Sequence, residues 1–187
     1  MASSSKQGIA GQITDRNFLT ATGFHFQVNR APSISYFGNR INVPGLQLGV
    51  VEQPSYLKNI PMPGEIIDFD DLTLRFLIDA NLENYNEVQK WIRGIGFPES
   101  LEQIYKFQEE NPAMVQPDRS QLNLYSDGTL TILNQLNRPV MKIVFENLFP
   151  YYLTPIQFDA TVADVEYLTA EVSFKYTIYN IRDIECC

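Results

Sequence analysis

The sequence predicts a mainly β protein, a sandwich or barrel of antiparallel strands with one or two flanking α-helices. Aromatic residues, which favour strands, are plentiful, with 12 Phe and 10 Tyr among 187 residues. Several segments alternate apolar and polar residues with the period of two that is typical of a half-buried strand. Residues 82–95 instead repeat apolar residues every three or four positions, which is the period of an amphipathic helix.

The length of the chain fits a single domain that can bury its own core. We expect residues 1–17, which are small and polar, to form a flexible arm, and residues 18–187 to form the domain. The formal net charge of −8 argues against a surface that grips nucleic acid. No apolar run approaches the ~20 residues of a membrane-spanning helix, and the N-terminus lacks the apolar core of a secretion signal, so we expect neither a membrane span nor secretion by that route.

The first strand is expected at residues 24–29, where apolar residues alternate with His25 and Gln27. A second strand is expected around Tyr36, so that residues 24–38 would form a hairpin. His25 is the only histidine in the chain and lies on the polar face of its strand. We therefore interpret it as a surface or subunit-contact residue rather than a catalytic one.

Residues 39–64 differ in composition from the rest of the chain, because prolines and glycines interrupt an apolar segment. Proline cannot donate to a central ladder, so no internal strand is expected here. A long apolar excursion in water is costly, so we expect an extended loop or hairpin that lies on the core or on another subunit. The candidate subunit-contact residues are Val43, Pro44, Gly45, Leu46, Leu48 and Val50.

The best-defined unit is a strand over residues 72–78 followed by an amphipathic helix that carries Trp91, the only tryptophan. Asp79 and Asn81 offer side-chain oxygens that could cap the start of this helix. A second helix is expected to follow, which gives a helical segment over residues 81–110. We interpret the first helix as a cover over the open face of a sheet.

The C-terminal part of the chain predicts further strands. Residues 121–125 and 129–134 flank Ser126-Asp127-Gly128, a sequence that predicts a short turn. A strand is expected over residues 140–145, and a long final strand over residues 168–178 shows the cleanest alternation in the chain.

We find no motif for catalysis, for a phosphate-binding loop or for a metal site, so we expect no catalytic residue, no cofactor and no metal. The densest carboxylate cluster, formed by Asp68, Asp70 and Asp71, lacks the glycine and the terminal glutamate of a calcium-binding EF-hand loop. We interpret it as an acidic entry to the strand that follows. The two cysteines, Cys186 and Cys187, are adjacent and close no useful loop, so we interpret them as free thiols.

Several short motifs follow one another in a characteristic order between residues 24 and 180. They are the Phe-x-Phe-x-Val strand, Val43-Pro44-Gly45, Phe69-Asp70-Asp71-Leu72-Thr73-Leu74, the helix with Trp91, Leu148-Phe149-Pro150 and the final alternating strand. Together they resemble the tail tube protein family of contractile-tailed bacteriophages. The tube protein of type VI secretion is similar in fold.

This resemblance implies a tail-tube-like β fold and a structural, non-enzymatic role. In the family, six copies form a ring whose inner strands join into a continuous barrel, and rings stack into a tube inside the contractile sheath. The implied partners are further copies of the chain, the sheath protein, the baseplate and the tape-measure protein. DNA would pass through the lumen without specific binding, in a virion tail assembled in the host cytoplasm.

The acidic charge of the chain suits a lumen that repels DNA phosphates. The candidate lumen-facing acidic residues are Asp68, Asp70, Asp164, Glu166 and Glu171. Two alternatives stay open. The chain could be a minor tube-like baseplate initiator or tail terminator protein, or it could be an acidic β-sandwich enzyme or ligand-binding module.

Overall fold

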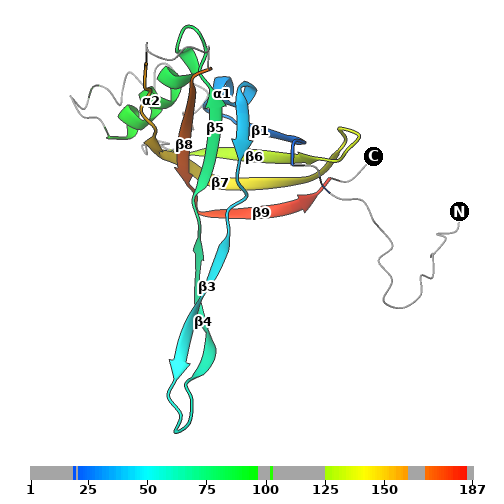
Figure 1. Ribbon diagram of the computed structural model, residues 1–187, viewed down its shortest axis with the longest axis vertical. Helices are drawn as coiled ribbons and strands as arrows, with labels where there is room; N and C mark the ends of the chain where they lie inside the picture. The colour runs from blue at the N-terminus through cyan, green and yellow to red at the C-terminus, as the bar shows by residue number, and fades with distance from the viewer. Residues whose placement is uncertain (1–18, 20, 97–101, 103–124, 160–166, 185–187) are drawn as a thin grey trace, which may run out of the picture.

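The computed structural model describes residues 19, 21–96, 102, 125–159 and 167–184 (Figure 1). The described elements are, in chain order, β1 (Phe24–Val28), α1 (Pro32–Tyr36), β2 (Gly38–Ile41), β3 (Leu46–Gln53), β4 (Ile60–Phe69), β5 (Leu72–Leu77), α2 (Glu83–Gly96), β6 (Ser126–Leu133), β7 (Pro139–Leu153), β8 (Thr169–Lys175) and β9 (Ile178–Asp183). Every strand pair among them is antiparallel. The predicted fold class, antiparallel β with flanking helices, is confirmed.

The long strand β7 belongs to two sheets. Its first half lies between β6 and β9 in the order β1-β6-β7-β9, which we call the four-stranded sheet. Its second half pairs with β8 in the order β7-β8-β5-β2, which we call the second sheet. Figure 1 shows that the strands of the two sheets run in clearly different directions, an arrangement that such a shared, bending strand allows.

A β-bulge accompanies the bend in β7. Gly128 pairs with Phe145 and Ser126 pairs with Leu148, so β7 carries one more residue than β6 between these two pairs. Asn147 lies in this interval with a positive φ of 57°. A bulge of this kind bends a strand and increases its twist, which is how β7 passes from one sheet into the other.

The core lies between the two sheets and beneath the helices. The fully buried large side chains come from both sheets and both helices; they are Phe26, Val28, Ile34, Leu72, Leu74, Phe76, Val88, Trp91, Leu130, Ile143, Phe145, Leu148, Val172 and Phe174. Burying each of them stabilises the fold by about 1.5–3 kcal/mol. The Trp91 ring lies 6.1 Å from that of Phe174, so α2 covers the second sheet as the apolar stripe predicts.

The start of α2 differs in detail from the prediction. Leu82 has a φ of 59° and precedes the helix, so it is not part of the buried stripe. Buried Asn84 bonds to the segment before the helix: its side chain accepts from the Asp79 amide (3.3 Å) and donates to the Leu77 carbonyl (2.7 Å). Its oxygen also accepts from the Tyr85 amide in the first turn (2.8 Å). Asn84 thus ties the helix to the end of β5. The Asp79 side chain, predicted as a helix cap, accepts from the Ala80 amide before the helix begins (2.8 Å). The second predicted helix lies outside the described residues, apart from residue 102.

The predicted hairpin over residues 24–38 is wrong. β1 pairs with β6, and the expected second strand is the short helix α1. Pro32 stands in its first turn, where its missing N–H costs nothing. Ile34 is buried, and the Ser35 hydroxyl accepts a hydrogen bond from the Val28 amide (3.1 Å), which folds α1 back onto β1.

The predicted turn at residues 126–128 is also wrong, because these residues form the start of β6; the strand predicted before them, at residues 121–125, lies outside the described residues apart from residue 125. A Cβ on Gly128 would lie 3.3 Å from a Leu148 methyl and 3.4 Å from the Phe26 ring, so this glycine makes room for core packing. The predicted final strand is in fact two strands, β8 and β9, joined by a corner at Tyr176 and Thr177.

Candidate assembly surfaces

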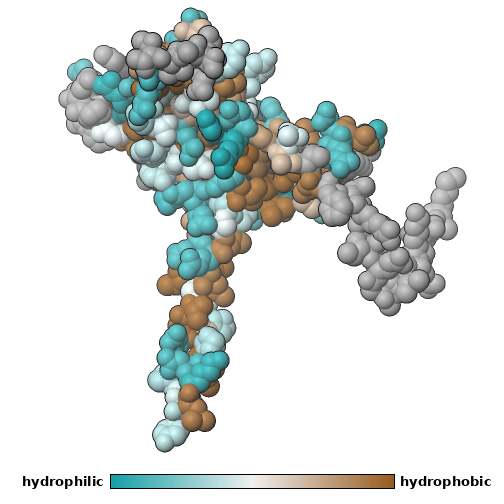
Figure 2. Space-filling view, viewed as in Figure 1, coloured by the Kyte–Doolittle hydropathy of each residue, from teal (hydrophilic) through white to brown (hydrophobic). Residues whose placement is uncertain are grey.

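A hairpin formed by β3 and β4 projects from the body of the molecule (Figure 1). Its apolar side chains are exposed, and Figure 2 shows them in brown along the hairpin; they include Leu46, Leu48, Val50, Val51, Ile60, Met62, Ile66 and Ile67. Leu46 and Val50 are 60% and 65% exposed. Exposed apolar side chains gathered on one element indicate an interaction site, because free monomers rarely expose so many together.

The two strands of the hairpin cross closely at Gly49 and Gly64. The pairing shifts register between Leu48 and Val50, which is the mark of a β-bulge. A Cβ on Gly64 would lie 2.7 Å from the Gly49 carbonyl oxygen and 2.9 Å from its carbon, so no larger residue fits without moving backbone. The crossing adds twist and turns the outer half of the hairpin relative to the inner half.

The candidate subunit-contact residues divide between the hairpin and its base. Leu46, Leu48 and Val50 lie on β3 and are exposed. Val43, Pro44 and Gly45 form the connection that leads into β3, where Val43 is exposed and Pro44 is buried. Their role in subunit contacts stays a prediction.

At the base of the hairpin, aromatic rings from the β8–β9 corner and from the start of β9 pack against β4. The Phe69 ring lies 5.9 Å from that of Tyr176 and 5.8 Å from that of Tyr179, in edge-to-face geometry. The same two tyrosine rings contact Phe145 of the core, at 5.2 and 5.7 Å. A chain of rings therefore runs from the core of the body into the hairpin.

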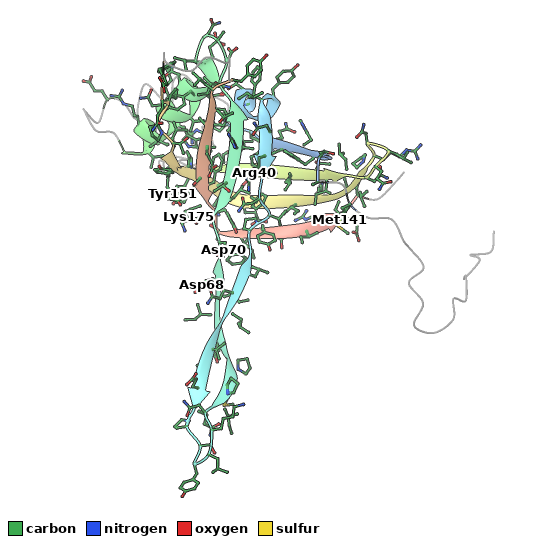
Figure 3. All side chains as sticks on the ribbon, viewed as in Figure 1. Arg40, Asp68, Asp70, Met141, Tyr151 and Lys175 are labelled. Atoms are coloured by element: carbon green, nitrogen blue, oxygen red, sulfur yellow. The ribbon has the colours of Figure 1, made fainter. Side chains whose placement is uncertain are left out.

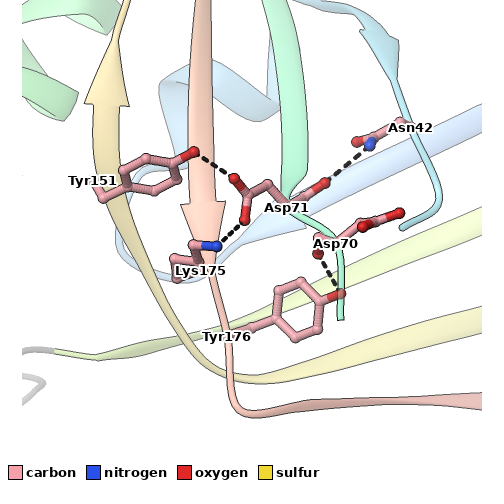
Figure 4. Close-up of polar contacts among 6 residues, drawn as sticks. All are labelled: Asn42, Asp70, Asp71, Tyr151, Lys175 and Tyr176. Carbon is pink, nitrogen blue, oxygen red and sulfur yellow. Dashed lines mark hydrogen bonds and ion pairs between the residues drawn. The ribbon is translucent and has the colours of Figure 1, made fainter. Parts of the chain in front are cut away.

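Beside these rings, the Asp71 carboxylate has two partners (Figures 3 and 4). Lys175 forms an ion pair with it, and the Tyr151 hydroxyl donates a hydrogen bond to it. The hydrogen bond from Lys175, followed by the one from Tyr151, lowers the pKa of Asp71, and the same contact with Asp71 raises the pKa of Lys175. Burial raises the pKa of neighbouring Tyr176 to about 12, so its hydroxyl stays a donor at neutral pH.

The candidate lumen-facing acidic residues lie on separate elements. Asp68 is on β4, Asp70 is between β4 and β5, and Glu171 is on β8 opposite Arg75. Figure 3 shows Asp68 and Asp70 near the base of the hairpin. Asp164 and Glu166 lie outside the described residues. None of the three described carboxylates belongs to the four-stranded sheet, and their position in a lumen stays a prediction.

The four-stranded sheet has a polar outer face that was not identified from the sequence. Its strand register places His25, Thr131, Lys142 and Arg182 in one row across β1, β6, β7 and β9. The next row contains Gln27, Thr129, Val144 and Asn180. Alternation predicted the polar face of the strand that carries His25, but only the pairing shows which polar residues are its neighbours on the other strands.

The edges of the four-stranded sheet are open in the described part of the chain, where no strand pairs with the outer side of β1 or β9. Ile181 of β9 lies opposite the buried Ile143, on the side of the sheet that faces the core, yet it is 58% exposed. One apolar side chain on the core side of the sheet is therefore uncovered at this edge.

Within the described residues, no three His, Cys, Asp or Glu side chains are grouped so that they could hold a metal ion. None of the described helices has the length and apolar character that crossing a membrane requires.

A family model described as phage tail tube protein matches residues 12–182 of the chain. The chain belongs to the phage tail tube protein family. This confirms the resemblance found in the sequence, and family membership makes the chain a tube-like structural protein. No curated protein matches this tail tube chain by sequence.

Several solved structures share the fold of this tail tube protein. The anti-feeding prophage tube-terminating cap has a chain with a TM-score of 0.57 and 14% identity, covering 94% of this chain and 97% of that one. A chain of the sheath–tube complex of an extracellular contractile injection system has a TM-score of 0.53 and 17% identity. The match covers 89% of this chain and 92% of that one. A chain of the anti-feeding prophage baseplate has a TM-score of 0.52 and 14% identity. The match covers 95% of this chain and 100% of that one.

Proposed function

We propose that this chain is the tube subunit of a contractile phage tail. Six copies form a ring, and the rings stack into a hollow tube inside a contractile sheath. The tube contacts the sheath and baseplate, and DNA and a tape-measure protein pass through it without specific binding. The subunit belongs to the virion tail, is assembled in the host cytoplasm and carries out no enzymatic reaction.

The observation that carries this proposal is the open four-stranded sheet. Unpaired edge strands promote pairing with another chain, and a closed barrel removes such edges altogether. Pairing of β9 with β1 of a neighbouring copy would satisfy both edges and cover the exposed Ile181. The same pairing would place the polar outer face of the sheet on the wall of the channel.

The β3–β4 hairpin supports stacking of the rings. Its exposed apolar side chains lie outside the core cluster of their own chain. Obligate interfaces usually bury more than ~2,000 Å² in total, and a hairpin of this size can supply a large share of that area. We therefore assign the hairpin to contact with a neighbouring copy, within the ring or between stacked rings.

Electron microscopy of the purified chain tests this function. We expect long tubes from the parent protein, and no tubes from the double variant Leu46→Ser/Leu48→Ser, because serine removes apolar surface from the hairpin. Leu136→Ser is the matched control, since Leu136 is 75% exposed in the turn between β6 and β7. Tubes of normal length from the double variant would rule out the role of the hairpin.

The second candidate is a tube-like initiator or terminator protein of the same kind of tail. Chains of similar fold occur in solved structures of a baseplate and of a tube-terminating cap, which is the observation in its favour. The same micrographs separate the two functions, because an initiator or terminator would form single rings and no tubes. If the protein forms no rings and no tubes at any concentration, both functions are contradicted.

A further inference from the structure

Two chain connections join the hairpin to the body. The first runs from Asn42 to Gly45 between β2 and β3, and the second consists of Asp70 and Asp71 between β4 and β5. A hairpin attached only by two connections could swing about them as a hinge. The direction of the hairpin therefore depends on what holds these connections.

The two connections are bonded to each other. The Asp70 amide donates to the Gly45 carbonyl (3.2 Å). The side chain of Asn42 accepts from the Thr73 amide (2.6 Å) and donates to the Asp71 carbonyl (2.9 Å) (Figure 4). These bonds keep the two connections side by side. Thr73 belongs to β5, and Asp71 also contacts Lys175 of β8 and Tyr151 of β7, so the connections are joined to the body at Asn42 and Asp71.

The corner between β8 and β9, together with the start of β9, bonds to both connections. The Tyr176 hydroxyl donates to the Asp70 carbonyl (2.8 Å), as Figure 4 shows. The Tyr179 hydroxyl donates to the Pro44 carbonyl (3.2 Å). Both rings are packed between Phe69 of the hairpin and Phe145 of the core, so the hydroxyl groups are carried on rigid supports.

We infer that Tyr176 and Tyr179 are positioning residues that hold the β3–β4 hairpin in one direction relative to the body before a second copy binds. The two hydroxyl groups bond to Pro44 and Asp70, which lie closer in the chain to β3 and β4 than Asn42 and Asp71 do, so they add anchors on the hairpin side of each connection. Pre-organisation of this kind reduces the entropy lost on association. The inference concerns the free chain, and only its benefit for assembly rests on the proposed function.

The width of a distance distribution between the hairpin tip and the body tests this inference. Spin labels are attached to the variants Tyr56→Cys at the tip and Leu136→Cys on the body, with Cys186 and Cys187 replaced by serine. Distances are recorded by pulsed electron paramagnetic resonance on the monomer fraction from size exclusion. The parent should give one narrow distribution, and Tyr176→Phe/Tyr179→Phe should at least double its width, because phenylalanine keeps the rings and removes the two hydroxyl groups.

Tyr36→Phe is the matched control, since Tyr36 is 84% exposed and contacts the neighbouring Phe37 ring. It should leave the distribution unchanged. Hydrogen exchange gives a second readout: the Asp70 amide should exchange roughly tenfold faster in the double variant, as expected for the loss of two hydrogen bonds. If the double variant does not fold by circular dichroism, each single Tyr→Phe variant should widen the distribution to an intermediate extent.

An unchanged width in the folded Tyr→Phe variants would overturn the inference, and so would a broad distribution in the parent. Tube formation is scored separately by electron microscopy. If the parent forms no tubes but its distance distribution is narrow and widens in the variant, the proposed function fails while the positioning role stands.

Discussion

Asp71 is the residue whose surroundings allow the sharpest test by pH. Hydrogen bonds from Lys175 and Tyr151 hold the pKa of Asp71 below its ordinary value of 3.8. A carboxyl group with a lowered folded-state pKa stabilises the fold above the ordinary pKa, and this contribution is lost as the pH falls through the lowered value. The pKa of Lys175 is raised above 10.5, so its contribution is lost only as the pH rises through that raised value.

We therefore expect Asp71→Asn to lower the free energy of unfolding at pH 7 by about 1 kcal/mol, a modest value because the pair is partly exposed. The difference from the parent should shrink as the pH is lowered below 3.8. Urea titrations at pH 7 and at a pH below 3.8 measure this difference in the free energy of unfolding. Asp68→Asn is the control, because Asp68 is exposed on β4, and a pH-independent effect of Asp71→Asn would contradict the assignment.

At the scale of the element, Gly64 determines the shape of the hairpin. Gly64→Ala places a methyl group against the backbone of Gly49, a clash that no side-chain rotation can relieve. We expect this variant to lose tube formation in electron micrographs. The free energy of unfolding of the body should change by less than about 0.5 kcal/mol, because the hairpin lies outside the core.

Gly96→Ala is the matched control, because a Cβ on Gly96 would meet no atom within 4 Å. It should assemble as the parent does. Tubes of parental yield from Gly64→Ala would show that the crossing of the two strands is not needed.

The elements themselves were largely predictable where local periodicity decides them. The strand that became β5 and the stripe around Trp91 followed from periods of two and of three to four. The segment around Tyr36 did not follow, because its residues fit a short strand and a helix equally well, and burial of Ile34 decided the outcome. The corner at Tyr176 was hidden, because the alternation of apolar residues continues through it from β8 into β9.

At the scale of the whole molecule, the sequence could not show which strands are neighbours. β1 pairs with β6, so Phe26 lies opposite Leu130, more than a hundred positions later in the chain. Local sequence patterns do not predict strand pairing between residues that are so far apart in the chain. The hairpin surface could therefore be predicted as a contact surface from Leu46 and Leu48, whereas the polar outer face of the four-stranded sheet could not.

Two placements of the channel wall can now be compared by experiment. If the outer face of the four-stranded sheet lines the channel, Asn180→Lys should slow genome ejection, because a ring multiplies each added charge and phosphates bind cations in a salt-dependent way. High salt should relieve the slowing. Asp68→Lys tests the placement predicted from the sequence.

Ejection is measured from particles whose tubes are normal in micrographs. Slowing by Asp68→Lys, Asp70→Lys or Glu171→Lys, with no effect of Asn180→Lys, would reject the four-stranded sheet as the wall. The opposite result would reject these carboxylates as lumen residues.

A separate prediction concerns the absence of enzymatic chemistry. His25 lies on the outer face of β1 opposite Thr131. His25→Ala should leave the infectivity of assembled particles unchanged, because no step depends on proton transfer by this side chain. Loss of infectivity with intact tubes would contradict a purely structural role.

Because the hairpin is long, a small rotation at its base produces a large displacement of its tip. The 10 residues of β4 span about 33 Å at the usual rise of a strand. A swing of about 10° at the base therefore moves the tip by about 6 Å, more than the ~4.8 Å between neighbouring strands. Such an error would shift the tip by more than the width of one strand. In the proposed tube, the angular tolerance of each subunit would therefore limit how straight a stack of many rings can be.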